Sequence, residues 1–239
     1  MTDFDDPNFV YDFISRRISM PYRATLVTAR DGGPIRTIIN GGSTHAMGRY
    51  HSGRTGRAQP WKTTVERSRY MVCEVDPDVR TYLAFPHRLD FAFGKKKFSF
   101  WPSLRVDFHS GKFQIERLPN RRSDPDEEPE SLVHAKDIYR RLGWTFVSRT
   151  VADVEGGQDF ANARKIELDN DVQICGQHVS TAAAAIAAGG GVSTYAAVSD
   201  ALGGGRVGRA ILHGLIVHGH LAFPLDKRLK ADTPVWARR

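Results

Sequence analysis

The sequence has few cysteines and no long apolar run, which are the features that define several large classes of protein. Its 239 residues contain only two cysteines, Cys73 and Cys175, which are far apart and lack a partner at metal-ligand spacing. This excludes a disulfide framework and a cysteine-based zinc site. The first residues are acidic, and no apolar run approaches the roughly 20 residues that span a bilayer. We therefore expect a soluble cytoplasmic protein with no membrane partner.

Familiar catalytic motifs are also missing. The nine histidines are scattered, and neither H-E-x-x-H, a Walker A loop nor a G-x-S-x-G elbow occurs. Residues 203–208 match G-x-G-x-x-G, but a helix rather than a strand is predicted before them, so they indicate a flexible turn. We therefore expect no bound cofactor and no metal ion.

The charge balance favours polyanionic partners. Lys and Arg number 34 against 27 Asp and Glu, which gives a formal net charge of +7. Neutralising phosphates with such cations releases counterions and stabilises nucleic-acid binding.

The first 170 residues predict a mixed α/β region. Strands are expected over 23–29 and 35–39, followed by a loop rich in Gly, Ser, Arg and His over 41–60. A helix over 61–74 precedes a three-strand meander, with strands 88–94, 98–108 and 113–118. An acidic, Pro-containing stretch over 124–130 leads to a helix over 131–143, a strand over 145–151 and a helix over 159–168.

The last residues follow a more specific pattern. Helices are predicted over 179–188, 194–202 and 206–218, with Gly-rich turns between them. Short strands over 220–223 and 233–236 flank a basic loop. Three helices followed by a hairpin are typical of a winged helix-turn-helix domain, whose third helix enters the major groove. We divide the chain into N-terminal strands and a basic loop over 1–60, a mixed-sheet domain over 61–170 and a winged helix over 176–239.

Basic and polar residues supply the expected contacts with double-stranded DNA. Arg206, Arg209 and His213 are predicted on the outer side of the third helix, and the hairpin loop carries three cations. Two basic segments of the larger domain would add phosphate contacts, which position the protein without reading sequence. The full predicted set is Arg54, Arg57, Lys95, Lys96, Lys97, Ser193, Thr194, Arg206, Arg209, His213, Lys227, Arg228 and Lys230.

The stretch from Arg36 to Leu118 resembles a known family. Arg36-Thr-Ile-Ile is followed by His51-Ser-Gly-Arg-Thr-Gly-Arg57, then by Trp61-Lys-Thr-Thr-Val-Glu66, and then by Asp76-Pro-Asp-Val79. The segment Phe98–Pro119 completes the order. This order is similar to that of TnsA, the Tn7-type transposition endonuclease. The resemblance implies a restriction-endonuclease-like PD-(D/E)XK fold, and so an α/β chain with a mixed-sheet domain before the winged helix.

The resemblance also implies a site, which this sequence departs from. In the family, an Asp and a Glu or Gln hold Mg²⁺, an adjacent Lys assists, and a helix Glu adds a carboxylate. The helix Glu falls on Glu66 and the Glu/Gln position on Gln114. The Asp is replaced by Ser103, and the Lys by Glu116. We interpret Glu66, Gln114 and Glu116 as a vestigial catalytic set, while ordinary polar residues of strands and a helix remain the plainer interpretation.

Two functions follow as hypotheses. The first is a nucleoid-associated DNA-binding protein built on a degenerate nuclease, serving as a regulator of transcription or an accessory factor of mobile elements. It would not be an enzyme. The second is an active Mg²⁺-dependent DNA endonuclease of the TnsA-like type with an atypical site. A docking role toward a protein partner, or a homodimer, stays open beside them.

Overall fold

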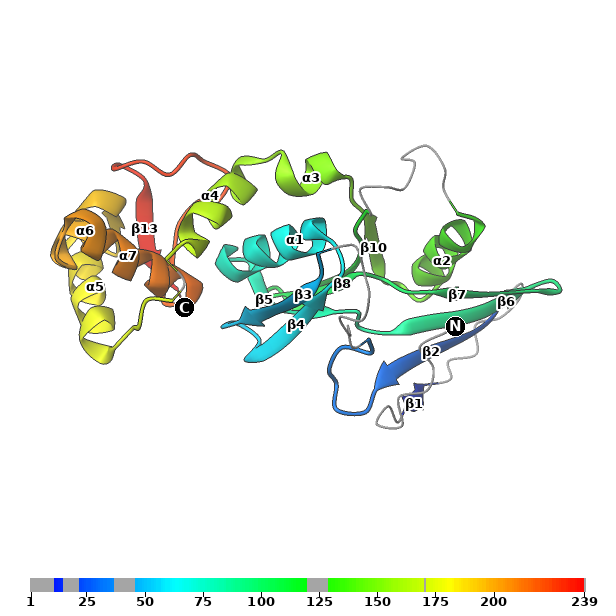
Figure 1. Cartoon of the computed structure of the whole chain (residues 1–239). Coiled ribbons are helices and arrows are strands. Elements are labelled where there is room, and N and C mark those ends of the chain that lie inside the picture. The colour runs from blue at the N-terminus through cyan, green and yellow to red at the C-terminus, as the bar shows by residue number, and fades with distance from the viewer. Residues whose placement is uncertain (1–10, 15–21, 37–45, 120–128, 170, 239) are drawn as a thin grey trace. The chain divides into compact units, whose positions relative to one another are not determined.

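The computed structural model describes residues 11–14, 22–36, 46–119, 129–169 and 171–238 (Figure 1). Helices and several small sheets alternate along these residues, which confirms the expected mixed α/β class. The chain divides into two compact units. One comprises residues 1–50, 58–66 and 82–151, and the other comprises 51–57, 67–81 and 152–239. The second unit thus takes in segments far earlier than the expected start of the last domain at 176.

The first sheet of the first unit is fully antiparallel, with strand order β1-β2-β6-β7. Successive residues of a strand point to opposite faces, so Leu89 and Phe91 are buried on one side while Arg88 and Asp90 line the other. The strands are β1 (Tyr11–Ile14), β2 (Tyr22–Ala29), β6 (Arg88–Phe93) and β7 (Lys96–Phe100).

The second sheet is mixed, with order β10-β9-β8-β5. Its strands are β5 (Val79–Ala84), β8 (Leu104–Phe108), β9 (Phe113–Arg117) and β10 (Thr145–Ser148). β8 and β9 are antiparallel, whereas β9 and β10 are parallel. Parallel neighbours need a crossover connection, and helix α2 (Glu130–Arg141) lies in the chain between them.

The expected three-strand meander is wrong. The predicted return strand over 98–108 is two strands, β7 and β8, which belong to different sheets. The break falls at residues 101–103, which include Pro102. Proline lacks an N–H for a ladder, so the pairing of β7 stops there.

Helix α2 carries the core of the first unit. Its apolar face, with Leu132, Ala135, Ile138 and Tyr139, packs with Leu89, Phe91 and Phe100 of the first sheet and Ile115 of the second. The helix therefore shares one core with both sheets.

The second unit holds the C-terminal helices and a small antiparallel sheet of order β11-β13-β12. Its elements in this region are α3 (Val151–Glu155), α4 (Gln158–Glu167), α5 (Gly176–Ala188), β11 (Val192–Thr194), α6 (Tyr195–Ala201), α7 (Gly205–Val217), β12 (Leu221–Ala222) and β13 (Pro234–Ala237). The three predicted helices and two predicted strands are present within a few residues of their expected bounds, while β11 and α3 were not expected. Ala163 and Ile166 of α4 share the core with α5, α6 and α7.

Three further elements complete the described chain: β3 (Gly48–Ser52), β4 (Arg57–Trp61) and α1 (Thr64–Val75). β3 and β4 pair as a two-stranded sheet, so the prediction of a loop over 41–60 is wrong for these strands. Residues 37–39 of the predicted strand, most of the acidic stretch 124–130 and the first part of the predicted loop lie outside the described residues. Over the residues that are described, no helix is long and apolar enough to cross a membrane.

Candidate nucleic-acid interface

The turn between α6 and α7 sets the start of the candidate recognition helix. Gly203, Gly204 and Gly205 all have positive φ values, between 56° and 109°, which favour glycine. A Cβ on Gly208 would lie 2.1 Å from the carbonyl oxygen of Ser199 in α6. The two helices can therefore pack this closely only with glycine at 208. The predicted flexible turn is thus a tight helix–helix connection.

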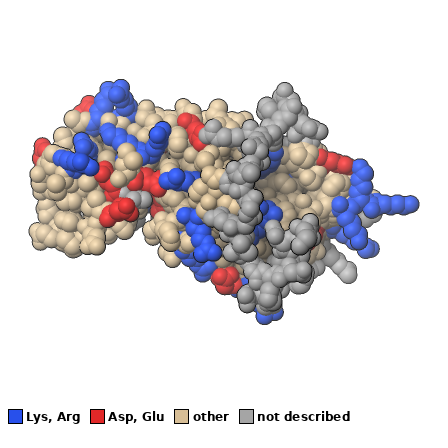
Figure 2. All heavy atoms as spheres, viewed as in Figure 1, with Lys and Arg blue, Asp and Glu red and all other residues tan. Residues whose placement is uncertain are grey.

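The first turns of α7 present cations to solvent. Arg206 and Arg209 are exposed, and Val207 between them is 66% exposed. The opposite side of the helix supplies Leu212, Leu215 and Ile216 to the core. In Figure 2, Lys and Arg side chains gather over the region that Figure 1 labels α4, α6 and α7 and over the loop before β13.

The prediction that His213 lies on the outer side of this helix is wrong. Its side chain is only 1% exposed. Its Nε2 lies 2.7 Å from the hydroxyl of Tyr195 in α6, and its Nδ1 lies 2.6 Å from a carboxylate oxygen of Asp169. Burial lowers the pKa of His213, while Asp169 acts in the opposite direction. At about 100° per residue, position 213 points the same way as 206 and 209, but it lies about one to two turns further along α7, where Tyr195 and Asp169 cover it. His213 therefore joins α7 to α6 and to the segment after α4.

Hydrogen bonds from a side chain of α4 hold the loop between β12 and β13 in place. The side-chain amide of Asn162 in α4 donates to the carbonyl oxygens of Leu225 and Lys227, at 2.9 and 2.7 Å, and accepts from the backbone N–H of Leu229. Leu225 and Leu229 are buried in the core. Lys227, Arg228 and Lys230 are exposed on this loop. The sequence pattern did not single out Asn162, although a polar residue on the apolar side of a predicted helix is a recognisable signal.

Ser193 and Thr194, two members of the predicted contact set, lie just before α6, and Thr194 rather than the expected Ser193 caps that helix. Ser193 is in β11, opposite Val235 of β13. Thr194 is the N-cap of α6, and its hydroxyl accepts a hydrogen bond from the N–H of Ala197. The Thr194 side chain therefore orders the helix start and remains exposed.

Arg54 has an internal role that its position in a basic stretch did not indicate. Its guanidinium donates to the carbonyl oxygens of Glu74 and Val79, around the end of α1. Arg238 donates to the same Val79 oxygen at 2.6 Å, and to Pro77 at 2.9 Å. Burial, together with the nearby Arg54 charge, lowers the pKa of Arg238 to about 10. Of the two predicted residues in this segment, Arg57 is exposed.

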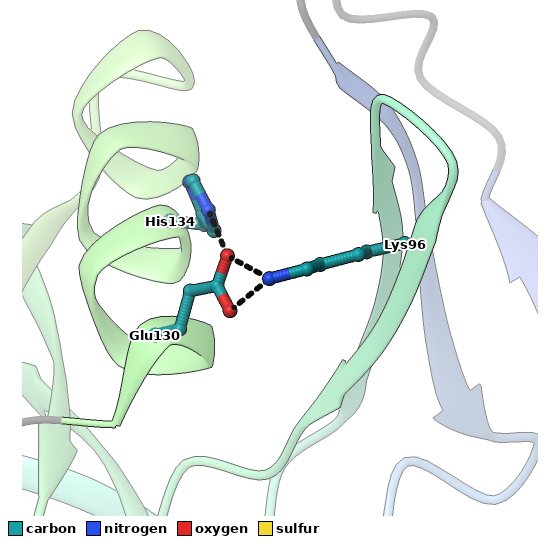
Figure 3. Close-up of polar contacts among 3 residues, drawn as sticks. All are labelled: Lys96, Glu130 and His134. Atoms are coloured by element: carbon teal, nitrogen blue, oxygen red, sulfur yellow. Dashed lines mark hydrogen bonds and ion pairs between the residues drawn. The ribbon is translucent and has the colours of Figure 1, made fainter.

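The three lysines of the other predicted basic turn lie at the β6–β7 hairpin, where Figure 2 shows a projecting group of cations. All three are exposed. Lys96 is paired with Glu130 at the start of α2, at 2.9 Å, and His134 lies one turn further along that helix (Figure 3). The Lys96 hydrogen bond is the main reason that the pKa of Glu130 is lowered.

Glu66 forms a helix cap. Its carboxylate accepts from the backbone N–H groups of Lys62 and Thr63, at 2.6 and 3.1 Å, and its own N–H donates to the Thr63 hydroxyl. This reciprocal pair is a capping box, the T-x-x-E pattern that the sequence shows over 63–66. Glu66 is 5% exposed, and burial raises its pKa.

Gln114 and Glu116 lie together on β9. The amide nitrogen of Gln114 is 2.5 Å from a carboxylate oxygen of Glu116, which also pairs with Arg149 at 3.1 Å. Across the ladder, Glu116 faces Leu104, and Gln114 faces Val106. The neighbouring strand thus offers apolar side chains where a second carboxylate would be needed.

Ser103 and Asp107 have other partners. The Ser103 hydroxyl accepts from the backbone N–H of Leu118, which ties the start of β8 to the end of β9. Asp107 pairs with Arg105 at 2.7 Å, on the opposite face of β8 from Leu104 and Val106. Within the described residues, no three His, Cys, Asp or Glu side chains gather closely enough to hold a metal ion.

No protein-family model matches the chain, and no curated protein matches it.

Proposed function

We propose that residues 176–239 form a winged helix that binds duplex DNA. The order α5–β11–α6–α7–β12–β13, with the three strands in one sheet, is compatible with this helix-turn-helix variant. In this arrangement α7 is the recognition helix, and the loop before β13 contacts the DNA backbone.

The observation that carries the proposal is the contrast along α7: residues 211–217 are all buried, whereas its first turns keep one side exposed. One side is buried with α6 and α4, while the first turns expose Arg206, Val207 and Arg209. Arg reads guanine by a bidentate contact, and an apolar side chain can contact the thymine methyl group. An exposed valine between two arginines at a helix start fits a base-reading surface better than a solvated face.

We further propose that the N-terminal unit is a nuclease-like domain that has lost cleavage. The mixed sheet β10-β9-β8-β5 is compatible with such a fold. Glu66 is engaged in the capping box, and Glu116 faces Leu104 rather than a carboxylate. The whole chain would then be a DNA-binding regulator or an accessory factor of mobile elements.

The test is a titration of the purified protein against labelled duplex DNA at two salt concentrations, with and without Mg²⁺ or Mn²⁺, followed by a denaturing gel. We expect salt-sensitive binding and intact DNA. Metal-dependent cleavage that disappears in Glu66→Ala and Glu116→Ala would establish the endonuclease instead.

Substitutions in α7 and in the loop before β13 test which part of the protein binds the DNA. Arg206→Ala and Arg209→Ala should each cost about 1–3 kcal/mol if the side chain makes a bidentate base contact. Lys227→Ala and Lys230→Ala should weaken binding equally for all sequences and lower the salt slope by about one each. Lys112→Ala, an exposed cation in the first unit, is the matched control. If all of these variants bind like the control, the winged helix does not bind DNA.

A further inference from the structure

The solvent-facing side of the first sheet is hollowed and basic. A shallow cavity of about 460 Å³ lies over β2, β6 and β7. The opposite face of the same strands is apolar and covered by α2. The hollow therefore lies on the face of the sheet that α2 does not cover.

Cross-strand pairing arranges the lining side chains in rows. The first row is Arg23, Ala92 and Lys97, and the second is Thr25, Asp90 and Ser99. Arg88, opposite Val27, begins the third. The small Ala92 side chain between two long cations accounts for the floor of the hollow.

The spacing of the cations matches a ligand that carries a row of negative charges. Arg23 and Lys97 lie on strands two apart, so their backbones are separated by roughly 10 Å, and Arg88 lies about 13 Å along the strand direction from that row. A single small anion cannot contact all three cations at such separations. A strand of successive phosphates can.

Among the described residues that line the hollow, Asp90 is the one carboxylate, and its partners lie within the hollow. Asp90 accepts from Arg88 at 2.9 Å and from the Ser99 hydroxyl at 2.7 Å. Three cations against one carboxylate leave the lining positive.

At one end the hollow lies beside two guanidinium groups that stack on a tryptophan ring. The guanidinium of Arg88 lies 5.4 Å from the Trp101 ring centroid, and that of Arg36 lies 4.3 Å from it. Unpaired bases stack on aromatic and guanidinium planes, whereas bases inside a duplex cannot reach them.

From these observations we propose that this sheet face binds a single nucleic-acid strand. Arg23, Arg88 and Lys97 contact its phosphates, and the Arg36–Trp101–Arg88 group stacks with its bases. This site is separate from the winged helix and does not depend on that assignment.

The test uses the full chain and a labelled 30-nucleotide single strand of mixed sequence. Arg23→Gln with Lys97→Gln should weaken binding roughly tenfold at low salt and lower the salt slope by about 1.4, because two phosphate contacts are lost. The control, Lys112→Gln with Arg67→Gln, removes two exposed cations elsewhere and should leave single-strand binding unchanged.

A variant that is expected to bind the single strand more tightly completes the test, because misfolding cannot explain a gain of affinity. Asp90→Asn removes the carboxylate from the hollow while keeping its shape, and it should tighten single-strand binding several-fold. If the double variant binds like its control, or if Asp90→Asn weakens binding, the proposal is overturned. Arg206→Ala with Arg209→Ala should reduce duplex binding and spare the single strand, so failure of either site is visible without the other.

Discussion

The side-chain nitrogen of Asn162 lies 2.7 Å from the carbonyl oxygen of Lys227, 65 residues further along the chain. With its bonds to Leu225 and Leu229, this one amide fixes the backbone that carries the cations before β13. A buried amide that satisfies three backbone groups makes the basic loop part of the fold rather than a mobile arm.

Asn162→Ala should therefore both destabilise the second unit and weaken duplex binding. It leaves buried backbone groups without partners, which costs about 2–3 kcal/mol. Urea unfolding measures the stability, and limited proteolysis reports opening of the loop. Gln158→Ala removes only a 3.1 Å bond to Asn162 and should cost under about 1 kcal/mol. Equal effects of the two variants would show that the loop is held by other contacts.

The capping role of Glu66 predicts a metal-independent effect. Glu66→Ala should lower the free energy of unfolding by about 1–2 kcal/mol, as loss of a helix cap does. Glu66→Gln keeps the accepting oxygen and should retain most of the stability. Thermal unfolding of all three proteins with and without Mn²⁺ checks this. A rise in Tm with Mn²⁺ in the wild type alone would point to a metal ligand instead.

Restoring the lysine of the TnsA-like pattern should harm the protein. Glu116 is fully buried, pairs with Arg149 and faces Leu104. Glu116→Lys places a second cation beside Arg149 and leaves both without a carboxylate, which should cost about 3–5 kcal/mol. Circular dichroism during urea unfolding measures the loss. Arg149→Met in the same background should recover part of it, whereas stable folding of Glu116→Lys alone would mean that the site tolerates the nuclease residue.

His87 predicts how stability depends on pH. It is buried, hydrogen-bonded to the Tyr139 hydroxyl at 2.7 Å, and its pKa is lowered from 6.5 to about 3, chiefly by burial and also by Arg105. The unfolded chain then binds a proton before the folded one does. This stability is fully present above pH 6.5 and is lost as the pH falls toward 3, at up to about 1.4 kcal/mol per pH unit.

The check for His87 is urea unfolding at pH 7 and pH 5. The wild type should lose about 2 kcal/mol more than His87→Gln over this interval, because glutamine keeps a polar partner for Tyr139 but does not titrate. An identical loss in both proteins would assign the pH dependence to other groups.

Much of the secondary structure follows from local pattern. The helices over 176–188, 195–201 and 205–217 show apolar residues at helical spacing, and the glycines at 203–205 end one helix before the next begins. These features depend on neighbours a few residues apart, so a single sequence displays them. Exposed cations on a polar helix side, such as Arg206 and Arg209, could be predicted for the same reason.

Other features were decided by segments far apart in the chain. Periodicity does not say which polar side chain is covered, and His213 is buried because Tyr195 and Asp169 meet it there. The strands β3 and β4 lack large apolar runs and form because they pair with each other. The candidate metal ligands were predicted from order and spacing alone, yet strand register placed Leu104 opposite Glu116. The sequence by itself determined the C-terminal helices and their exposed charges, whereas the tertiary structure decided the sheet pairing and which polar groups became partners, because burial and strand register depend on distant contacts.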